Sequence, residues 1–402
     1  MVCFNDIVEA QQILNGIIKH TSLKKSKTFS EMTDSNMYLK MENLQLTGSF
    51  KIRGAYNKIY HLSQKEKENG IVCSSAGNHA QGVALASSLL NVNSTVFMPI
   101  FAPPTKILAT KEYGAKVILQ GNTYDEAFNA AKQFSLKNNV TFVHAFNDDK
   151  VIAGQGTLGL ELVEDLKDID VVLIPIGGGG LIAGVAIALK HLIPDVKIIG
   201  VVAKGANAML KSVKAKKIVS MRGMSTIADG IAVKNPGDIT FEIIKKKVDK
   251  IVPVSDQEIA QTMYHLLQRA KLVVEPAGAA SLAAALYKKV SYPDRNIISV
   301  LSGGNVNLSL LDQVIEQGMM NNNLMARLSI IAPDKSKVLK DIIGVLSNIN
   351  ANVQSINLDR STTSVPVGSV KILLTFQTLD SDQIKYITQE IKNKGLDCEI
   401  TC

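Results

Sequence analysis

The stretch VVLIPIGGGGLIAG, residues 171–184, combines two patterns that together indicate a fold class. Residues 171–176 are apolar and rich in β-branched side chains, and an apolar segment suited to a helix begins at Leu181. A buried strand that runs through glycines directly into a helix is typical of parallel sheets in α/β proteins. The stretch therefore predicts a strand, a tight turn and a helix.

The four glycines of this turn, Gly177, Gly178, Gly179 and Gly180, carry a high cost in chain entropy. The sequence offers almost no structural reason for them except a close approach of backbone N–H groups to an anion, and phosphate is the expected occupant. The alternative is a flexible turn. The turn matches neither GxxxxGK[ST] nor GxGxxG followed by an acidic residue, which disfavours an NTPase or a nicotinamide enzyme.

Short β-branched runs alternate with helical stretches on both sides of this turn. The runs are IVCSS (71–75), STVFMPI (94–100), KVILQG (116–121), KIIGVVA (197–203) and IISVLSG (297–303). Strands that alternate with helices predict an α/β fold with parallel sheets. The two series lie on either side of a break near 145–170. They predict a small lobe over about 48–150 and a large lobe from the rest of a catalytic domain at 1–320.

The C-terminal residues begin a different pattern. QGMMNNN (317–323) is a polar run that we interpret as a linker. Residues 325–402 then predict the order βαββαβ, with helices over about 336–349 and 381–394, which is the split ferredoxin-like arrangement. The run KILLTFQT (371–378) is predicted to be an exposed edge strand, so we expect it to pair with another subunit. The expected assembly is a homo-oligomer, either a dimer or a tetramer.

Composition excludes several classes of protein. No apolar run reaches the ~18 residues of a membrane helix, and the N-terminus shows no signal pattern. The net charge of +8 is scattered, and its densest cluster, KSVKAKK (211–217), contains no aromatic residue, so neither nucleic acid nor membrane is expected as a partner. The four cysteines are few and dispersed, which predicts free thiols in a reducing, cytoplasmic compartment. No histidine pairs with cysteines at zinc spacing, so no metal site is expected.

A lysine in unusual surroundings lies in QLTGSFKIRGA (45–55). Lys51 is enclosed by small and apolar residues, which a surface lysine does not need. SSAGNHAQG (74–82) forms a second strand-to-helix turn, where backbone N–H groups and the Asn78 amide suit a carboxylate or phenolic oxygen. A tight turn with a polar helix cap is the alternative for that loop.

Two further turns are weaker signals. LSGGNVN (301–307) ends a strand and carries the Ser302 hydroxyl, although an ordinary serine turn is equally compatible. EPAGAAS (275–281) contains Glu275, which we interpret as a helix-capping or interdomain acid. A phosphate turn, a carboxylate-type loop and a lysine in a small-residue pocket together indicate pyridoxal 5′-phosphate, which such a lysine holds as a Schiff base.

The ordered set of motifs resembles the threonine/serine dehydratases, pyridoxal-phosphate enzymes of the tryptophan synthase β-type fold (fold type II). The motifs are TGSFKIRGA, SAGNHAQG, GGGGLIAG, TIADGIAVK, EPAGAAS and LSGGN, and the resemblance covers residues ~5–320. The set is specific, whereas no single glycine motif is. Residues 325–402 resemble an ACT regulatory domain, mainly through the βαββαβ order.

The resemblance implies functions for individual residues. Lys51 corresponds to the Schiff-base lysine and general base. The implied cofactor-binding residues are Lys51, Phe50, Asn78, Gly177, Gly178, Gly179, Gly180, Leu181 and Ser302. The implied substrate-binding residues are Ser75, Ala76, Gly77, Asn78 and His79. For His79, a structural hydrogen bond at the helix start is an equally compatible interpretation.

The resemblance also implies an activity, which is β-elimination of L-threonine to 2-oxobutanoate and ammonia, and also of L-serine to pyruvate. The implied setting is either isoleucine biosynthesis or threonine catabolism. The alternatives are a serine racemase and an inactive, ligand-sensing relative. Serine racemases carry a serine at the position of Ala76, and that hydroxyl transfers a proton on the second face of the substrate, which Ala76 cannot do.

Two other positions depart from the family pattern. Many relatives hold a cation with an acidic residue where this chain has Lys204, so either the ammonium replaces the charge of the metal or the site is lost. ACT domains that bind amino acids usually carry a proline–glycine pair where this chain has Ser336 and Lys337. A branched-chain amino acid is the effector that the resemblance implies.

Overall fold

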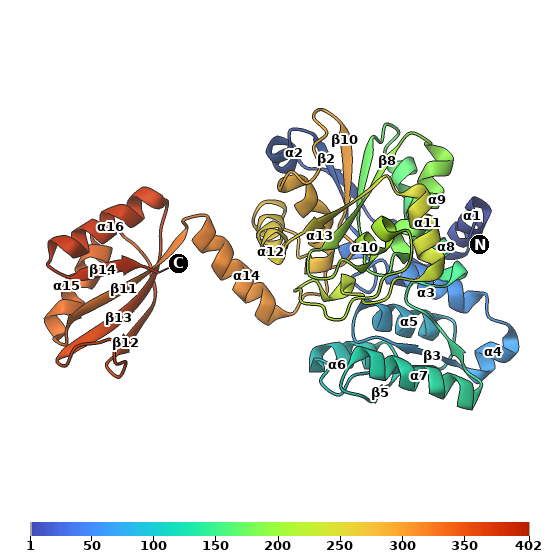
Figure 1. Cartoon of the computed structure of the whole chain (residues 1–402), viewed down its shortest axis with the longest axis horizontal. Helices are drawn as coiled ribbons and strands as arrows, with labels where there is room; N and C mark the ends of the chain where they lie inside the picture. Colours follow the sequence, from blue (N-terminus) through green and yellow to red (C-terminus); the bar gives the residue numbers. More distant parts are fainter. Residues whose placement is uncertain (1, 402) are drawn as a thin grey trace. The chain divides into compact units, whose positions relative to one another are not determined.

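The computed structural model describes residues 2–401 and divides the chain into two compact units after Asn307. The first unit contains one sheet that is parallel throughout and one that is parallel except for an antiparallel outer strand, and the second unit contains one antiparallel sheet. Figure 1 colours the chain from blue at the N-terminus to red at the C-terminus, through the first unit and then the second. No helix among the described residues has the length and apolar character needed to cross a membrane.

The large lobe is built on a six-stranded sheet. In spatial order its strands are β1 (Leu23–Lys25), β2 (Asn36–Lys40), β10 (Asn296–Val300), β7 (Val171–Pro175), β8 (Lys197–Ala203) and β9 (Lys250–Val254). All neighbours are parallel except β1 and β2. Every residue of β7 is buried, as expected for a central strand with helices on both faces.

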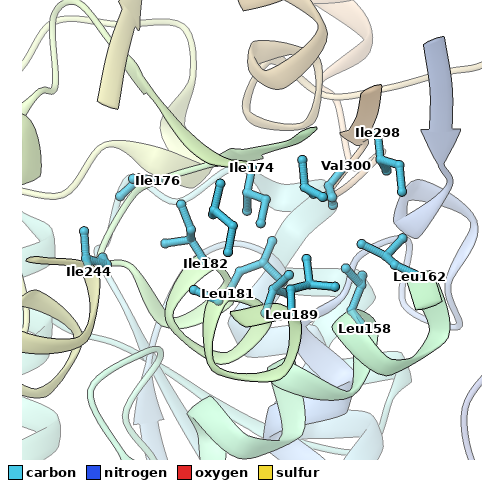
Figure 2. Close-up of a cluster of buried hydrophobic side chains, with 14 of the residues drawn as sticks. Leu158, Leu162, Ile174, Ile176, Leu181, Ile182, Leu189, Ile244, Ile298 and Val300 are labelled. Atoms are coloured by element: carbon cyan, nitrogen blue, oxygen red, sulfur yellow. The ribbon is translucent and has the colours of Figure 1, made fainter. Parts of the chain in front are cut away.

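Helices α8 (Asp149–Asp165) and α9 (Gly180–Leu192) pack together beneath this sheet. Their leucines and isoleucines meet aliphatic side chains of β7 and β10 (Figure 2). The labelled members of this core are Leu158, Leu162, Ile174, Ile176, Leu181, Ile182, Leu189, Ile244, Ile298 and Val300. Burial of each such side chain contributes about 1.5–3 kcal/mol, so this core holds the start of α9 firmly against the end of β7.

The small lobe carries a four-stranded sheet that is parallel throughout. In spatial order its strands are β5 (Lys116–Leu119), β4 (Ser94–Met98), β3 (Ile71–Ser74) and β6 (Thr141–Phe142). The accompanying helices are α3 (Lys51–Tyr60), α4 (Gln64–Asn69), α5 (Asn78–Leu89), α6 (Pro104–Glu112) and α7 (Tyr124–Asn138). The prediction of two lobes with parallel sheets is therefore confirmed.

The remaining helices of the first unit surround the large lobe. They are α1 (Phe4–Leu14), α2 (Lys27–Thr33), α10 (Ala208–Ala215), α11 (Asp238–Lys247), α12 (Asp256–His265) and α13 (Pro276–Leu286), with the short turns η1 (Glu42–Leu44), η2 (Asp229–Ile231) and η3 (Leu266–Ala270). Helix α13 begins with proline directly after Glu275, which therefore occupies the N-cap position. The carboxylate of Glu275 makes no side-chain cap hydrogen bond, so its oxygens can accept hydrogen bonds from residues outside the helix.

The second unit contains the predicted βαββαβ order. Its elements are β11 (Met325–Pro333), α15 (Ser336–Ser347), β12 (Val353–Asp359), β13 (Ser369–Gln377), α16 (Ser381–Asn393) and β14 (Asp397–Ile400). The sheet is antiparallel in the order β12-β13-β11-β14. One face buries aliphatic residues of the strands against α15 and α16, which accounts for the strong amphipathic pattern of both helices.

Two predictions about this part of the chain are wrong. Residues 317–321 are the last turns of helix α14 (Leu308–Asn321) rather than an irregular linker, and the compact units divide before that helix. The run 371–378 is not an edge, because β13 pairs with β11 on one side and with β12 on the other. The outer strands are β12 and β14. Alternating burial alone does not distinguish a central strand from an edge strand.

Candidate active site

A cavity of about 620 Å³ is lined by residues of both lobes. Because β3 and β7 are both parallel strands, their carboxyl ends carry the two loops that a ligand would meet first. All the site residues proposed from the sequence line this cavity: Phe50, Lys51, Ser75, Ala76, Gly77, Asn78, His79, Gly177, Gly178, Gly179, Gly180, Leu181 and Ser302. Tertiary structure thus brings together motifs separated by more than two hundred residues.

Lys51 is the first residue of α3, and its amine faces the cavity. The Nζ atom donates to the Ala145 carbonyl at 3.3 Å and lies 5.1 Å from the centre of the Phe50 ring. Loss of hydration lowers the pKa of Lys51 to about 8, and the opposite charge of Glu275 only partly counteracts this. A lysine with this pKa is present partly as the free amine near neutral pH, which nucleophilic and basic chemistry both require.

Arg53, two positions after Lys51, is not among the residues that line the cavity. Its guanidinium is fully buried and forms ion pairs with Glu42 at 2.8 Å and with Glu161 at 2.6 Å. It also donates to Thr157 Oγ1 at 3.2 Å, so all its N–H groups have partners. This bidentate network fixes α3 against α8 and thereby sets the direction from which Lys51 enters the cavity.

The glycine turn joins Pro175, the last residue of β7, to Gly180, the first residue of α9. Gly179 has a φ of +95°, which favours glycine. The Thr240 hydroxyl donates to the Gly178 carbonyl at 2.7 Å and holds the turn from outside. The first turn of α9 therefore presents backbone N–H groups at the cavity, an arrangement suited to a phosphate.

The interpretation that these glycines have almost no structural reason is wrong. A Cβ at Gly177 would lie 2.9 Å from Ile231 Cα, and one at Gly179 would lie 2.6 Å from the Ile244 side chain. A Cβ at Gly178 would overlap the Phe146 ring. Packing within the protein thus requires glycine at these positions before any ligand is considered, which the sequence alone did not reveal.

The loop Ser75–Gly77 between β3 and α5 behaves differently. A Cβ at Gly77 would have no atom of residues 2–401 within 4 Å, so packing does not require glycine there. The Gly77 N–H donates to Ser75 Oγ at 3.1 Å, which shapes the loop from within. Ala76 contributes a methyl group to the cavity lining and offers no proton for transfer.

His79 is engaged in a structural hydrogen bond. Its Nε2 lies 3.0 Å from the Val143 carbonyl, and because a carbonyl only accepts, Nε2 carries the hydrogen. Burial lowers the pKa of His79 to about 3, so the ring stays neutral. Of the two interpretations offered for His79, the structure supports the structural bond, although the residue also lines the cavity.

Ser302 follows β10 and is 2% exposed. Its carbonyl accepts from the Phe50 N–H at 3.2 Å, and a β-bridge joins Ser49 to Gly303. These backbone contacts place the LSGGN turn directly beside the lysine motif. Ser302 therefore lines the same cavity as Lys51.

Comparison with known proteins identifies the family. A family model described as pyridoxal-phosphate dependent enzyme matches residues 14–303. The chain belongs to this family. A second model, for the ACT domain, matches residues 320–394 of the enzyme.

Individual relatives agree with this assignment. The enzyme is 45% identical over 400 residues to an L-threonine ammonia-lyase of Thermotoga maritima, and the match covers 100% of both chains. The solved structure of threonine deaminase isoform 2 from Solanum lycopersicum superposes with a TM-score of 0.75 at 38% identity, covering 78% of this chain and 92% of that one. A maize serine racemase superposes with a TM-score of 0.75 at 34% identity, covering 80% and 98%.

The residues of the cavity fit pyridoxal phosphate. Lys51 supplies an amine with a lowered pKa, which donates a hydrogen bond to the Ala145 carbonyl. The start of the 13-residue helix α9 supplies N–H groups for the phosphate. Ser302 supplies a neutral hydroxyl, and the open space beside Gly77 leaves room for a bound molecule.

Several cavity residues of the enzyme were not identified from sequence. Glu275 accepts from Asn78 Nδ2 at 2.7 Å, whereas the sequence suggested only a capping or interdomain acid. His144 accepts at Nδ1 from the N–H groups of Phe146 (3.2 Å) and Asn147 (3.0 Å), and the Phe146 ring packs against the glycine turn. The segment TFVHAF after α7 was the available signal, since two aromatic residues and a histidine at a strand end are unusual in a surface loop.

Lys204 lies at the end of β8, where its N–H donates to the Val254 carbonyl at 2.7 Å. Its side chain is exposed. Within residues 2–401, no group of three or more His, Cys, Asp or Glu side chains is arranged to hold a metal ion.

Proposed function

We propose that this enzyme is an L-threonine ammonia-lyase, which converts L-threonine to 2-oxobutanoate and ammonia and also converts L-serine to pyruvate. The observation that carries the proposal is Lys51, a lysine with a pKa of about 8 whose amine opens into the cavity beside the glycine turn. The substrate class follows from the 45% identity to a threonine ammonia-lyase over the whole of both chains.

In this proposal Lys51 has two functions. When bound, pyridoxal phosphate supplies an aldehyde carbon that bonds to amines and a ring that stabilises negative charge at the α-carbon. Lys51 Nζ is the group that would anchor the aldehyde, and as a free amine it would remove the α-proton of the substrate. Its lowered pKa keeps part of the amine unprotonated at neutral pH for that step.

The other residues bind and orient. The N–H groups at the start of α9 would hold the phosphate, and Ser302 would face the ring nitrogen with a neutral hydroxyl. The loop Ser75–His79 would bind the substrate carboxylate through its backbone, with the Asn78 amide close to the ring hydroxyl. Loss of the α-proton and β-hydroxyl removes water, and the resulting enamine tautomerises and is hydrolysed to the 2-oxo acid and ammonia.

The direct test of this function is a steady-state assay of the purified enzyme with pyridoxal phosphate, L-threonine and L-serine. Formation of 2-oxobutanoate with a higher kcat/KM than that of pyruvate supports the proposal. Pyruvate formation alone would assign the chain to serine, and no product from either amino acid would support the inactive, ligand-sensing alternative.

Serine racemase is the second candidate, favoured by the maize structure and opposed by Ala76. Because Ala76 has no proton to transfer and His79 is neutral and bound to Val143, we expect L-serine to yield pyruvate with less than about 1% D-serine. Ala76→Ser should increase D-serine formation by about tenfold or more, since it restores a hydroxyl on that face. Chiral chromatography measures both enantiomers. Equal rates of D-serine and pyruvate formation by the unmodified enzyme would contradict this assignment.

The ACT domain leads us to propose an amino-acid effector of branched-chain type. The turn between β11 and α15 is held by a bidentate ion pair between Asp334 and Arg360, with N–O distances of 2.6 and 2.9 Å. We expect isoleucine or valine to change the threonine concentration at half-maximal rate by about fivefold, a typical allosteric coupling. Arg360→Ala should change this response, and Lys385→Ala, on the exposed face of α16, is the matched control. A full-length enzyme insensitive to both amino acids would contradict effector binding.

We further propose a homo-oligomer in the cytoplasm. Cys3, Cys73 and Cys398 are free thiols, which a reducing compartment maintains, and Cys402 lies outside the described residues. The outer strands β12 and β14 of the ACT sheet leave backbone groups that another subunit could pair with.

A further inference from the structure

Two amide side chains and one carboxylate form a continuous hydrogen-bonded chain at the cavity wall. Asn305 Nδ2 donates to Asn78 Oδ1 at 2.7 Å, and Asn78 Nδ2 donates to Glu275 Oε1 at 2.7 Å. Asn305 Nδ2 also donates to the Thr47 carbonyl at 2.8 Å. These four residues come from four separate glycine-containing motifs, which explains why those motifs occur together in one chain.

The direction of every bond in this chain is determined at its Thr47 end. The Thr47 carbonyl can only accept, so the atom of Asn305 that faces it must be the nitrogen. That nitrogen donates onward, so Asn78 must face it with the oxygen. The Asn78 nitrogen is then directed at the Glu275 carboxylate, which accepts. Rotating the Asn78 amide by half a turn would oppose two donors at one end and two acceptors at the other.

Glycines make room for this arrangement. A Cβ at Gly303 would lie 2.5 Å from Glu275 Oε1 and 3.1 Å from Asn78 Nδ2. A Cβ at Gly48 would overlap Asn305 Oδ1, and Gly48 has a φ of +68°. The glycines of the TGSFK and LSGGN motifs are thus required by the amide chain, and not by the lysine alone.

The burial of Glu275 makes the chain rigid. Glu275 is 4% exposed, although Asn78, Glu275 and Lys51 all line the same cavity. Asn78 Nδ2 uses one N–H on Glu275, and its second N–H has no partner among the described residues. A half-buried amide that is held at both ends and retains one free donor is preorganised to bind an acceptor in the cavity.

We propose that Asn305 and Glu275 are positioning residues that fix the Asn78 amide in one orientation, so that its free N–H donates to the ring hydroxyl oxygen of pyridoxal phosphate. This rests on the cofactor assignment in the proposed function. It adds two residues that act on the cofactor through Asn78.

A double-mutant cycle tests whether Asn305 acts through Asn78. The affinity of full-length apoenzyme for pyridoxal phosphate is measured by equilibrium dialysis, together with the visible absorbance of the bound cofactor, for the unmodified chain, Asn305→Ala, Asn78→Ala and the double variant. We expect Asn305→Ala to weaken binding about fivefold, the usual value of one hydrogen bond. In the Asn78→Ala background the same substitution should change binding by less than about twofold. Equal losses in both backgrounds would overturn the proposal.

Glu275 provides a second route if Asn305→Ala fails to fold, as judged by circular dichroism and Tm. Glu275→Gln retains an oxygen that can accept from Asn78 and should stay within about twofold of the unmodified affinity. Glu275→Ala removes the acceptor and should weaken binding about fivefold. If Gln and Ala weaken binding equally, the charge of Glu275 matters rather than its orientation of Asn78, and the proposal is wrong.

Asn138→Ala is the matched control, because Asn138 is exposed and its Nδ2 donates to the Phe134 carbonyl within α7, at 2.9 Å. We expect it to change neither affinity nor absorbance.

Different results would refute the proposed function and the positioning role of Asn305 and Glu275. An unmodified chain that does not bind pyridoxal phosphate would refute the proposed function, whereas binding that is insensitive to Asn305 and Glu275 would refute the positioning chain alone.

Discussion

Replacing Lys51 with alanine should lower kcat for 2-oxobutanoate formation by about 10³-fold or more, because one amine serves both as anchor and as base. The visible absorbance of the bound cofactor should shift, since the bond to Nζ is lost. Lys51→Arg is the matched control for charge, as arginine keeps a cation at this position but cannot become a free base near neutral pH. It should be about as inactive as the alanine variant. Steady-state kinetics with L-threonine and absorbance spectra measure these effects, and near-normal turnover in either variant would refute the role of Lys51.

Although the same substitution should lower activity, we expect it to stabilise the folded apoenzyme at neutral pH. Burial lowers the pKa of Lys51 from 10.5 to about 8, so between these values the unfolded chain binds more protons than the folded chain. The free energy of unfolding of the unmodified apoenzyme should therefore rise with pH across this window, and the contribution should be absent from Lys51→Ala. Urea denaturation at pH 7.5, 8.5 and 9.5 measures the difference. A loss of stability in Lys51→Ala at the lowest pH would indicate a structural role instead.

Gly178→Ala should lower the free energy of unfolding by about 1–3 kcal/mol, because the added methyl group overlaps the Phe146 ring in a closely packed turn. Since the turn must shift to relieve this overlap, we also expect the affinity for pyridoxal phosphate to fall about tenfold, through loss of N–H contacts to the phosphate. Thermal denaturation of the apoenzyme and equilibrium dialysis with the cofactor measure the two effects separately.

Gly223→Ala is the matched control for this substitution. Gly223 lies in the segment between α10 and η2, and a Cβ there meets no atom within 4 Å in the described part of the chain. We expect its stability and affinity to remain within experimental error of the unmodified enzyme. A Gly178→Ala variant that is as stable as Gly223→Ala and binds the cofactor normally would show that the turn tolerates a side chain, contrary to the packing seen here.

Much of the fold is readable from the sequence because it depends on local patterns. The apolar run 171–176 and the glycines after it specify a strand and a turn independently of distant parts of the chain. Both are found as expected. The order βαββαβ after residue 325 also follows from periodicity and turn residues. The linker prediction failed for 317–321 because polar residues are compatible with the exposed end of an amphipathic helix. The edge-strand prediction failed because pairing partners are chosen by the whole sheet.

The sequence by itself determined the chemistry that is possible here: a lysine in a small-residue motif, four glycines at a strand end, and an asparagine and a serine in separate turns. Tertiary structure decided how those groups are used. It gave Lys51 its lowered pKa by removing water around the amine, and it turned Arg53 into a buried anchor between two carboxylates. It also joined Asn305, Asn78 and Glu275 into one directed chain. Hydration and hydrogen-bond direction depend on atoms that are distant in sequence and adjacent in space, and so only the folded chain fixes them.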